Sequence, residues 1–193
     1  MRNPRILAFA GSIRTGSFNG RLAALAVKEL ALLDVETTLI SLVDYPMPIY
    51  DGDREAKSGP PENAVMLKRM IMRQHGVFIA SPEYNASVTP LLKNALDWVS
   101  RVRENGELAL AAYKNRVFAL GAASSGTLGG YRSLMALRQV LELGCGALVL
   151  PEQIAVRDAA SGFDEAGGLR DERAANTLRG VLGRLVEAAR QFV

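Results

Sequence analysis

The sequence has very little of what most metal sites and nucleophile sites require. Among its 193 residues, Cys145 is the only cysteine and His75 is the only histidine. A single cysteine excludes an intramolecular disulfide and a cysteine metal cluster. A single histidine nearly excludes a histidine zinc site and a Ser-His-Asp triad with spare histidines. We therefore expect no metal centre and no nucleophilic triad of catalytic residues.

Long apolar segments and runs of basic residues are also missing. No apolar run approaches the roughly 20 residues that span a bilayer. The first predicted strand lies near the amino terminus without a signal peptide before it, so we expect a cytoplasmic location. The net charge is +3 and the sequence pI is about 9.2, but the Lys and Arg residues are scattered. We expect no membrane partner and no nucleic-acid partner.

What the sequence does have is enough apolar residues for a core, since 49% are hydrophobic and 22% are charged. Short apolar runs predict strands at residues 5–10, 35–40, 76–80, 116–120 and 146–150, the last closed by Pro151. Amphipathic patterns predict helices at about residues 17–33, 60–74, 89–99, 134–141 and 178–189. This alternation predicts one α/β domain over residues 1–193, a doubly wound parallel sheet with helices on both faces. Residues 44–53, rich in Pro and Asp, are predicted to form a long loop.

The segment GSIRTGSFN, residues 11–19, joins the first strand to the first helix. Ser12, Ser17 and Asn19 offer hydroxyl and amide donors, and Arg14 offers a fixed positive fork. The helix directs the positive end of its dipole to the same place. These features predict a phosphate site. The plainer alternative is a Ser- and Asn-capped helix behind a glycine turn.

Two further loops carry unusual residues. The third strand ends in SPEYN, residues 81–85, where the Tyr ring and backbone groups suit a flat heterocycle. The fourth strand ends in GAASSGTLGG, residues 121–130, whose glycines let the backbone approach a planar ligand. An ordinary helix-start loop and a flexible glycine-rich turn are the alternatives. The loops after strands one, three and four lie at the carboxyl edge of such a sheet, where ligands bind.

The motifs GSxRxxSxN, SPEYN with KNALDW, and SSGxxGG together resemble the NADPH-dependent FMN reductase family, which includes chromate, quinone and azo-dye reductases. The resemblance covers nearly the whole chain. It implies a flavodoxin-like, five-stranded sheet of order 2-1-3-4-5 with FMN at its carboxyl edge. It also implies an enzyme that passes hydride from NADPH or NADH to bound FMN. The electrons then go to a quinone, azo compound, chromate-type oxyanion or free flavin, without a protein acid or base.

The resemblance also assigns cofactor-binding residues by position. They are Ser12, Arg14, Ser17 and Asn19 at the FMN phosphate, Pro82, Glu83, Tyr84 and Asn85 at the isoalloxazine ring, and Ser124, Gly126, Gly129 and Gly130 at the ring's other edge. Family members commonly form dimers or tetramers, which implies a homodimer or homotetramer in which residues 48–51 approach a neighbour's flavin. Ala86 stands where family members often have Gly, which narrows the pocket over the flavin.

Other interpretations remain open from the sequence. A flavodoxin-type electron carrier is the main alternative, although such carriers are usually acidic and this chain is mildly basic. A Walker-type NTPase and a dinucleotide Rossmann domain are disfavoured, because the first loop of this chain has neither the Gly-Lys-Ser/Thr ending of the one nor the G-x-G-x-x-G motif of the other. Arg101, Arg103 and Arg132 are candidates for contact with the 2′-phosphate of NADPH.

Overall fold

The structure is a computed structural model that describes residues 3–104 and 106–193. The strands are β1 (Arg5–Ala10), β2 (Glu36–Ile40), β3 (Gly76–Ala80), β4 (Val117–Ala123) and β5 (Leu148–Val156). The helices are α1 (Phe18–Ala31), α2 (Gly52–Ser58), α3 (Glu62–Met72), α4 (Pro90–Arg101), α5 (Tyr131–Gln139) and α6 (Glu172–Ala189). Short helical segments are η1 (Leu42–Asp44), η2 (Val140–Gly144) and η3 (Arg190–Phe192). Residues 1–2 and 105, which the domain prediction includes, lie outside the described residues.

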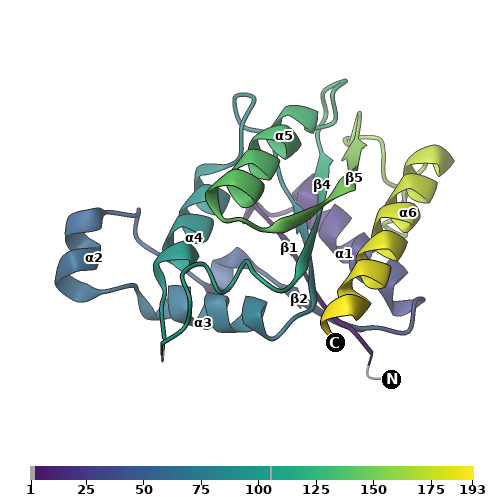
Figure 1. Cartoon of the computed structure of the whole chain (residues 1–193). Helices are drawn as coiled ribbons and strands as arrows, with labels where there is room; N and C mark the ends of the chain where they lie inside the picture. The colour runs from purple at the N-terminus through teal and green to yellow at the C-terminus, as the bar shows by residue number, and fades with distance from the viewer. Residues whose placement is uncertain (1–2, 105) are drawn as a thin grey trace.

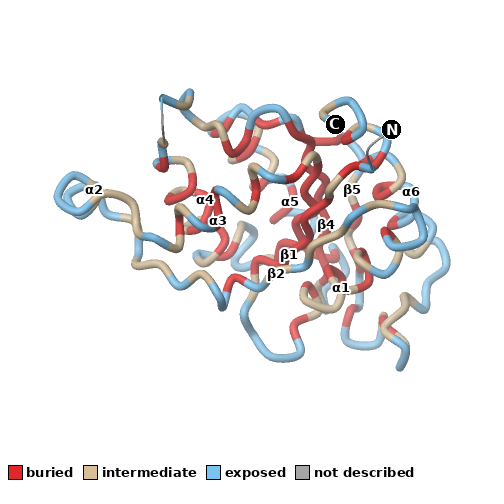
Figure 2. Tube along the Cα trace, turned by 90° about the horizontal axis from the view of Figure 1, so that it is seen from below, coloured by how far each residue is buried: buried red, intermediate tan, exposed pale blue. Residues whose placement is uncertain are grey.

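The described strands form one parallel sheet in the order β2-β1-β3-β4-β5. Helices α1 and α6 cover one face of the sheet, and α3, α4 and α5 cover the other (Figure 1). β3 and β4 are buried along their whole length because helices cover both faces. Figure 2 shows β4 as a buried strand inside the molecule. The predicted flavodoxin-like, doubly wound fold is confirmed.

The fifth strand differs from the prediction. Pro151 does not close it, because β5 continues to Val156. Proline lacks an N–H and fits a sheet only at an edge or a bulge. Both conditions hold here, since β5 is an edge strand and its register against β4 shifts between Phe118 and Leu120. β4 is also longer than predicted and ends at Ala123, which brings the ends of β4 and β5 together.

The predicted loop at residues 44–53 was wrong at its end, where α2 begins. Asp51 starts this helix by accepting hydrogen bonds from the N–H groups of Asp53 and Arg54. None of the residues of α2 is buried, and the helix stands off the body of the molecule (Figures 1 and 2). The buried Trp98 holds the base of this arm, donating to the Pro48 carbonyl and meeting the Tyr50 ring edge-on.

The lone histidine and cysteine both have structural surroundings. His75 lies between α3 and β3, and its Nδ1 accepts the N–H of Arg5 at 3.0 Å. Burial lowers the pKa of His75, and the neighbouring Arg5 cation lowers it further. Burial raises the pKa of the Cys145 thiol to about 11. The thiol is therefore protonated, and the side chain packs in the core as a small apolar group. Within the described residues, no group of His, Cys, Asp and Glu could hold a metal ion.

In the described part of the chain, no helix is both long enough and apolar enough to cross a membrane.

Candidate functional site

The loops after β1, β3 and β4 meet at the carboxyl edge of the sheet around a cavity of about 200 Å³. The sheet order places these three strands side by side, so their loops are neighbours although they lie far apart in sequence. The lining includes eight of the residues predicted from the sequence: Ser12, Arg14, Ser17, Asn19, Pro82, Glu83, Tyr84 and Ser124. Phe18, Ala123 and Ser125 complete the lining. Asn85, Gly126, Gly129 and Gly130 lie in the same loops but do not line this cavity.

The start of α1 supplies hydrogen-bond donors to the cavity. Ser17 caps the helix by accepting the N–H of Gly20 at 3.3 Å. The N–H groups of Phe18 and Asn19, in the first turn, have no hydrogen-bond partner within the described residues. The Arg14 guanidinium lies 5.7 Å from the centre of the Phe18 ring. Free N–H groups, hydroxyls and one cation at a helix start are what a phosphate requires.

Asn19 has a second role that its sequence position did not reveal. Its side chain is 97% buried, with a relative exposure of only 3%. The amide donates to the Ala123 carbonyl at 2.8 Å and accepts the Ala123 N–H at 3.0 Å. This two-way bond fastens the start of α1 to the end of β4. Asn19 therefore sets the spacing of two walls of the cavity.

The segment after β3 forms a tight turn that presents Tyr84. The Tyr84 and Ser87 backbones exchange both of their hydrogen bonds at 3.0 Å. Asn85 and Ala86, between them, have positive φ values of 48° and 63°. This combination is typical of the two-residue turn that joins paired strands. The turn leaves the Tyr84 side chain 52% exposed beside the cavity.

Ala86 is strained in this turn, and we expect Ala86→Gly to stabilise the protein. A left-handed conformation costs an L-residue about 1–2 kcal/mol, and the flexibility of glycine in the unfolded chain returns about 0.4–1 kcal/mol of that. The net gain is therefore about 0–1.6 kcal/mol, and each 1 kcal/mol raises Tm by about 2–4 °C in a chain of this size. Differential scanning calorimetry measures this. Ala24→Gly, inside α1, is the matched control and lowers Tm. A lower Tm for Ala86→Gly would contradict the assigned strain.

Glu83 and Arg132 form an ion pair across the site that the sequence did not predict. The Arg132 side chain donates to the Glu83 carboxylate at 2.7 Å, and the Arg132 N–H donates to it at 3.1 Å. Because this carboxylate is neutralised, Arg14 is the one unpaired charged group among the described residues that line the cavity.

The arginines considered for the 2′-phosphate of NADPH are mostly engaged elsewhere. Arg132 pairs with Glu83, and Arg101 pairs with Glu55 at 2.9 Å. The Arg101 guanidinium holds the pKa of the Glu55 carboxyl below its usual range. Both contacts count against these two side chains as phosphate ligands, because a phosphate would have to displace a carboxylate.

The glycines after β4 serve packing as well as turning. Gly129 and Gly130 have φ values of 62° and 89°, which disfavour other residues. A Cβ at Gly129 would lie 2.9 Å from backbone atoms of Ala155 and Val156, and one at Gly130 would lie 2.7 Å from Ala122. The glycines therefore let the loop lie directly against the ends of β4 and β5.

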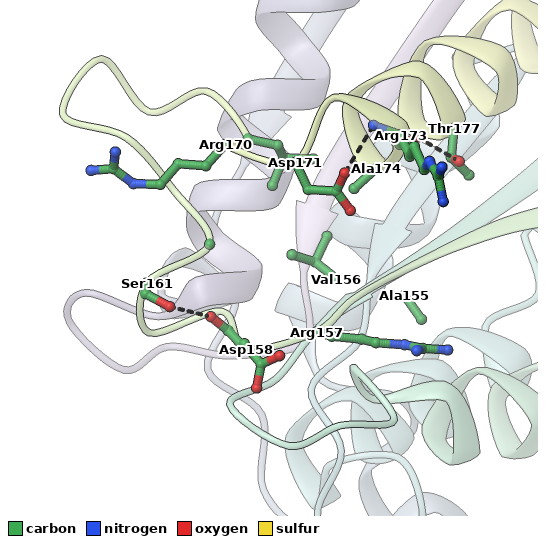
Figure 3. A pocket seen from close by; sticks show the side chains of 12 residues that line it. Ala155, Val156, Arg157, Asp158, Ser161, Arg170, Asp171, Arg173, Ala174 and Thr177 are labelled. Atoms are coloured by element: carbon green, nitrogen blue, oxygen red, sulfur yellow. Dashed lines mark hydrogen bonds between the residues drawn. The ribbon is translucent and has the colours of Figure 1, made fainter.

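A larger cavity, of about 460 Å³, lies beside the end of β5 and the start of α6 (Figure 3). It contains none of the residues predicted for the site. In Figure 3, Arg157 and Arg170 point in opposite directions, and Arg170 points away from the cavity. The carboxylates of Asp158 and Asp171 also line this cavity and would repel a phosphate, so it suits a phosphate less well than the smaller cavity.

The fold and the three-loop cavity together define a flavodoxin-like protein whose carboxyl edge carries a cavity suited to a phosphate-bearing ligand. A sequence model of the family described as NADPH-dependent FMN reductase matches residues 4–161. The chain belongs to this family. It is an oxidoreductase whose cofactor is FMN and whose co-substrate is NAD(P)H. The family resemblance predicted from the three loop motifs is confirmed.

Individual relatives agree with this assignment. A quinone reductase of Escherichia coli (strain K12) is 34% identical over 138 residues, which cover 71% of this chain and 69% of the relative. An NAD(P)H-dependent FMN reductase of Pseudomonas aeruginosa is 33% identical over 172 residues, covering 88% and 86%. Among solved structures, the flavoenzyme NAD(P)H:(acceptor) oxidoreductase FerB of Paracoccus denitrificans has a TM-score of 0.79 and 25% identity, with 98% of both chains covered.

Proposed function

We propose that this enzyme uses NAD(P)H to reduce quinones through FMN bound at the three-loop site. Bound FMN supplies the redox chemistry, taking a hydride from NAD(P)H and giving two electrons to the acceptor. The chain supplies binding, orientation and electrostatics. Ser12, Arg14, Ser17 and the N–H groups at the start of α1 hold the phosphate, with Asn19 fixing that helix to β4.

The turn after β3 and the loop after β4 hold the isoalloxazine ring. Pro82, Glu83, Tyr84 and Asn85 contribute mainly backbone groups on one side, and Ser124, Gly126, Gly129 and Gly130 border the other. Gly129 and Gly130, at positive φ and packed against the ends of β5 and β4, leave this backbone without side chains that would keep a flat ligand away.

The exposed Tyr84 ring is the observation that carries the quinone proposal. A half-exposed aromatic face beside the cavity favours a flat, neutral acceptor that can stack on it. A small oxyanion such as chromate needs a free cation, but Arg14 is assigned to the FMN phosphate and the Arg132 guanidinium is already paired with Glu83. Relatives at 33–34% identity carry the name quinone reductase, which favours the same acceptor class.

Acceptor competition tests this proposal. We expect kcat/KM with a simple benzoquinone or naphthoquinone to exceed the values for an azo dye, chromate and free FMN under the same NADPH supply. Tyr84→Ala is expected to raise the quinone KM several-fold, while Tyr84→Phe, which keeps the ring, stays near the parent value. Chromate or free FMN as the best acceptor would contradict the proposal, as would an unchanged quinone KM in Tyr84→Ala.

We further propose that one domain, residues 1–193, carries the activity and assembles as a homodimer or homotetramer. The α2 arm supports assembly, because it has no buried residue in the single chain and Ile49 at its base is 76% exposed. Light scattering that returned a monomer mass would contradict this. We place the enzyme in the cytoplasm, since that is where cells maintain the NAD(P)H pool it consumes.

A further inference from the structure

Glu83 forms an ion pair with the Arg132 side chain and also accepts a hydrogen bond from the Arg132 backbone. The carboxylate accepts hydrogen bonds from Arg132 Nε at 2.7 Å and from Nη2. It also accepts one from the Arg132 backbone N–H at 3.1 Å. The Glu83 side chain is only 9% exposed, whereas Arg132 is 56% exposed. The carboxylate is therefore the buried partner, and its negative charge needs the arginine to neutralise it.

The start of α5 depends on this contact. Its N-cap residue is Gly130, which has no side chain with which to cap the helix. The first-turn N–H groups of a helix need acceptors, and a carboxylate at that end also opposes the positive end of the helix dipole. Glu83 supplies that acceptor from a different loop, 49 residues earlier in the chain.

A second contact joins the same two segments, between the residue after Arg132 and the residue two before Glu83. The Ser133 hydroxyl lies 3.1 Å from the Ser81 carbonyl oxygen and 3.0 Å from the Ser81 hydroxyl, and both serines are fully buried. Ser81, Glu83, Arg132 and Ser133 thus form a latch between the segment after β3 and the first turn of α5, which the loop after β4 leads into. Since these are the two walls assigned to the isoalloxazine ring, the latch sets the width of the gap between them.

We propose that Glu83 and Arg132 are positioning residues that fix these two walls at the spacing FMN requires. They act through the backbone of residues 81–85 and 129–131, and neither side chain needs to touch the cofactor. This inference rests on the proposed placement of the FMN ring between these loops. It also gives Arg132 a role other than reading the NADPH phosphate.

Hydrogen exchange of the protein without FMN tests the latch itself. In Glu83→Gln, which keeps the side-chain size, we expect faster exchange in peptides covering residues 81–87 and 130–134. Glu142→Gln is the matched control, because it breaks the Arg138–Glu142 pair at the far end of α5, away from both loops. Unchanged exchange in Glu83→Gln would overturn the latch, whatever the location of FMN.

Cofactor binding and its spectrum then test positioning. At a temperature where every variant is folded, we expect Glu83→Gln and Arg132→Gln each to raise the FMN Kd about tenfold. The double variant should bind FMN no more weakly than either single variant, because all three break the same contact. At saturating FMN, the visible circular dichroism of the bound flavin should also change in these variants and not in Glu142→Gln.

The outcomes separate the two claims. Faster exchange with an unchanged Kd and an unchanged flavin spectrum would overturn the positioning role while leaving the latch as a structural contact. Additive losses in the double variant would likewise overturn a shared role. If Arg14→Ala left FMN binding intact as well, the fault would lie with the proposed FMN site and not with the latch.

Discussion

Arg14→Ala is expected to weaken FMN binding by about ten- to hundredfold. A hydrogen bond between charged groups is worth about 1.5–3 kcal/mol, and each 1.4 kcal/mol is a factor of ten in Kd. Within the described residues, Arg14 is the cation that lines the cavity without a carboxylate partner. In Arg14→Ala, no other unpaired cation among the described lining residues can therefore replace the lost charge at the phosphate.

Isothermal titration calorimetry of the protein freed of FMN measures this effect. Arg21→Ala is the matched control: it removes an arginine in the first turn of α1, close to Arg14 in the chain, that contacts Phe163 and the Asp164 carbonyl and does not line the cavity. We expect its FMN Kd to stay within about twofold of the parent value. Arg14→Lys keeps the charge but loses the forked geometry, so an intermediate Kd is expected. An unchanged Kd in Arg14→Ala would remove Arg14 from the site.

Asn19→Ala is expected to lower both the stability of the protein and its affinity for FMN. The substitution leaves the buried N–H and carbonyl of Ala123 without their partners. An unpaired buried polar group costs about 1–3 kcal/mol, so the two together lower the free energy of unfolding by about 2–6 kcal/mol. Since α1 then loses its link to β4, FMN binding weakens even at temperatures where the variant is folded.

Urea unfolding gives the stability change, and the same titration calorimetry gives the Kd. Asn176→Ala, on the exposed face of α6, is the matched control and should change stability by less than about 0.5 kcal/mol. A loss in Asn19→Ala no larger than that of the control would show that the two-way bond to Ala123 contributes little. A loss of stability with a normal FMN Kd would confine Asn19 to a structural role.

The sequence predicted the sheet well because a buried parallel strand has a strong local pattern. β3, with residues 76–80 apolar throughout, was predicted at its observed bounds. The cap at Ser17 was also visible, because a cap is a contact between residues three apart. The carboxyl-edge site followed from these elements, since the topology brings the three loops together.

What the sequence did not reveal depends on partners far along the chain. Asn19 and Ala123 are 104 residues apart, and Glu83 and Arg132 are 49 apart, so no local pattern connects them. Pro151 was misinterpreted for a related reason. Proline ends a central strand, and only the observed edge position and register shift explain why β5 tolerates it.

The most direct test of the whole account is the visible absorption spectrum of the protein loaded with FMN, recorded before and after anaerobic addition of NADPH. We predict flavin absorption bands that bleach when NADPH is added and return when a quinone follows. Bands that persist with both NADPH and NADH would contradict an NAD(P)H-dependent reductase and favour an electron carrier. A protein that took up no FMN would contradict the proposed site at the three loops.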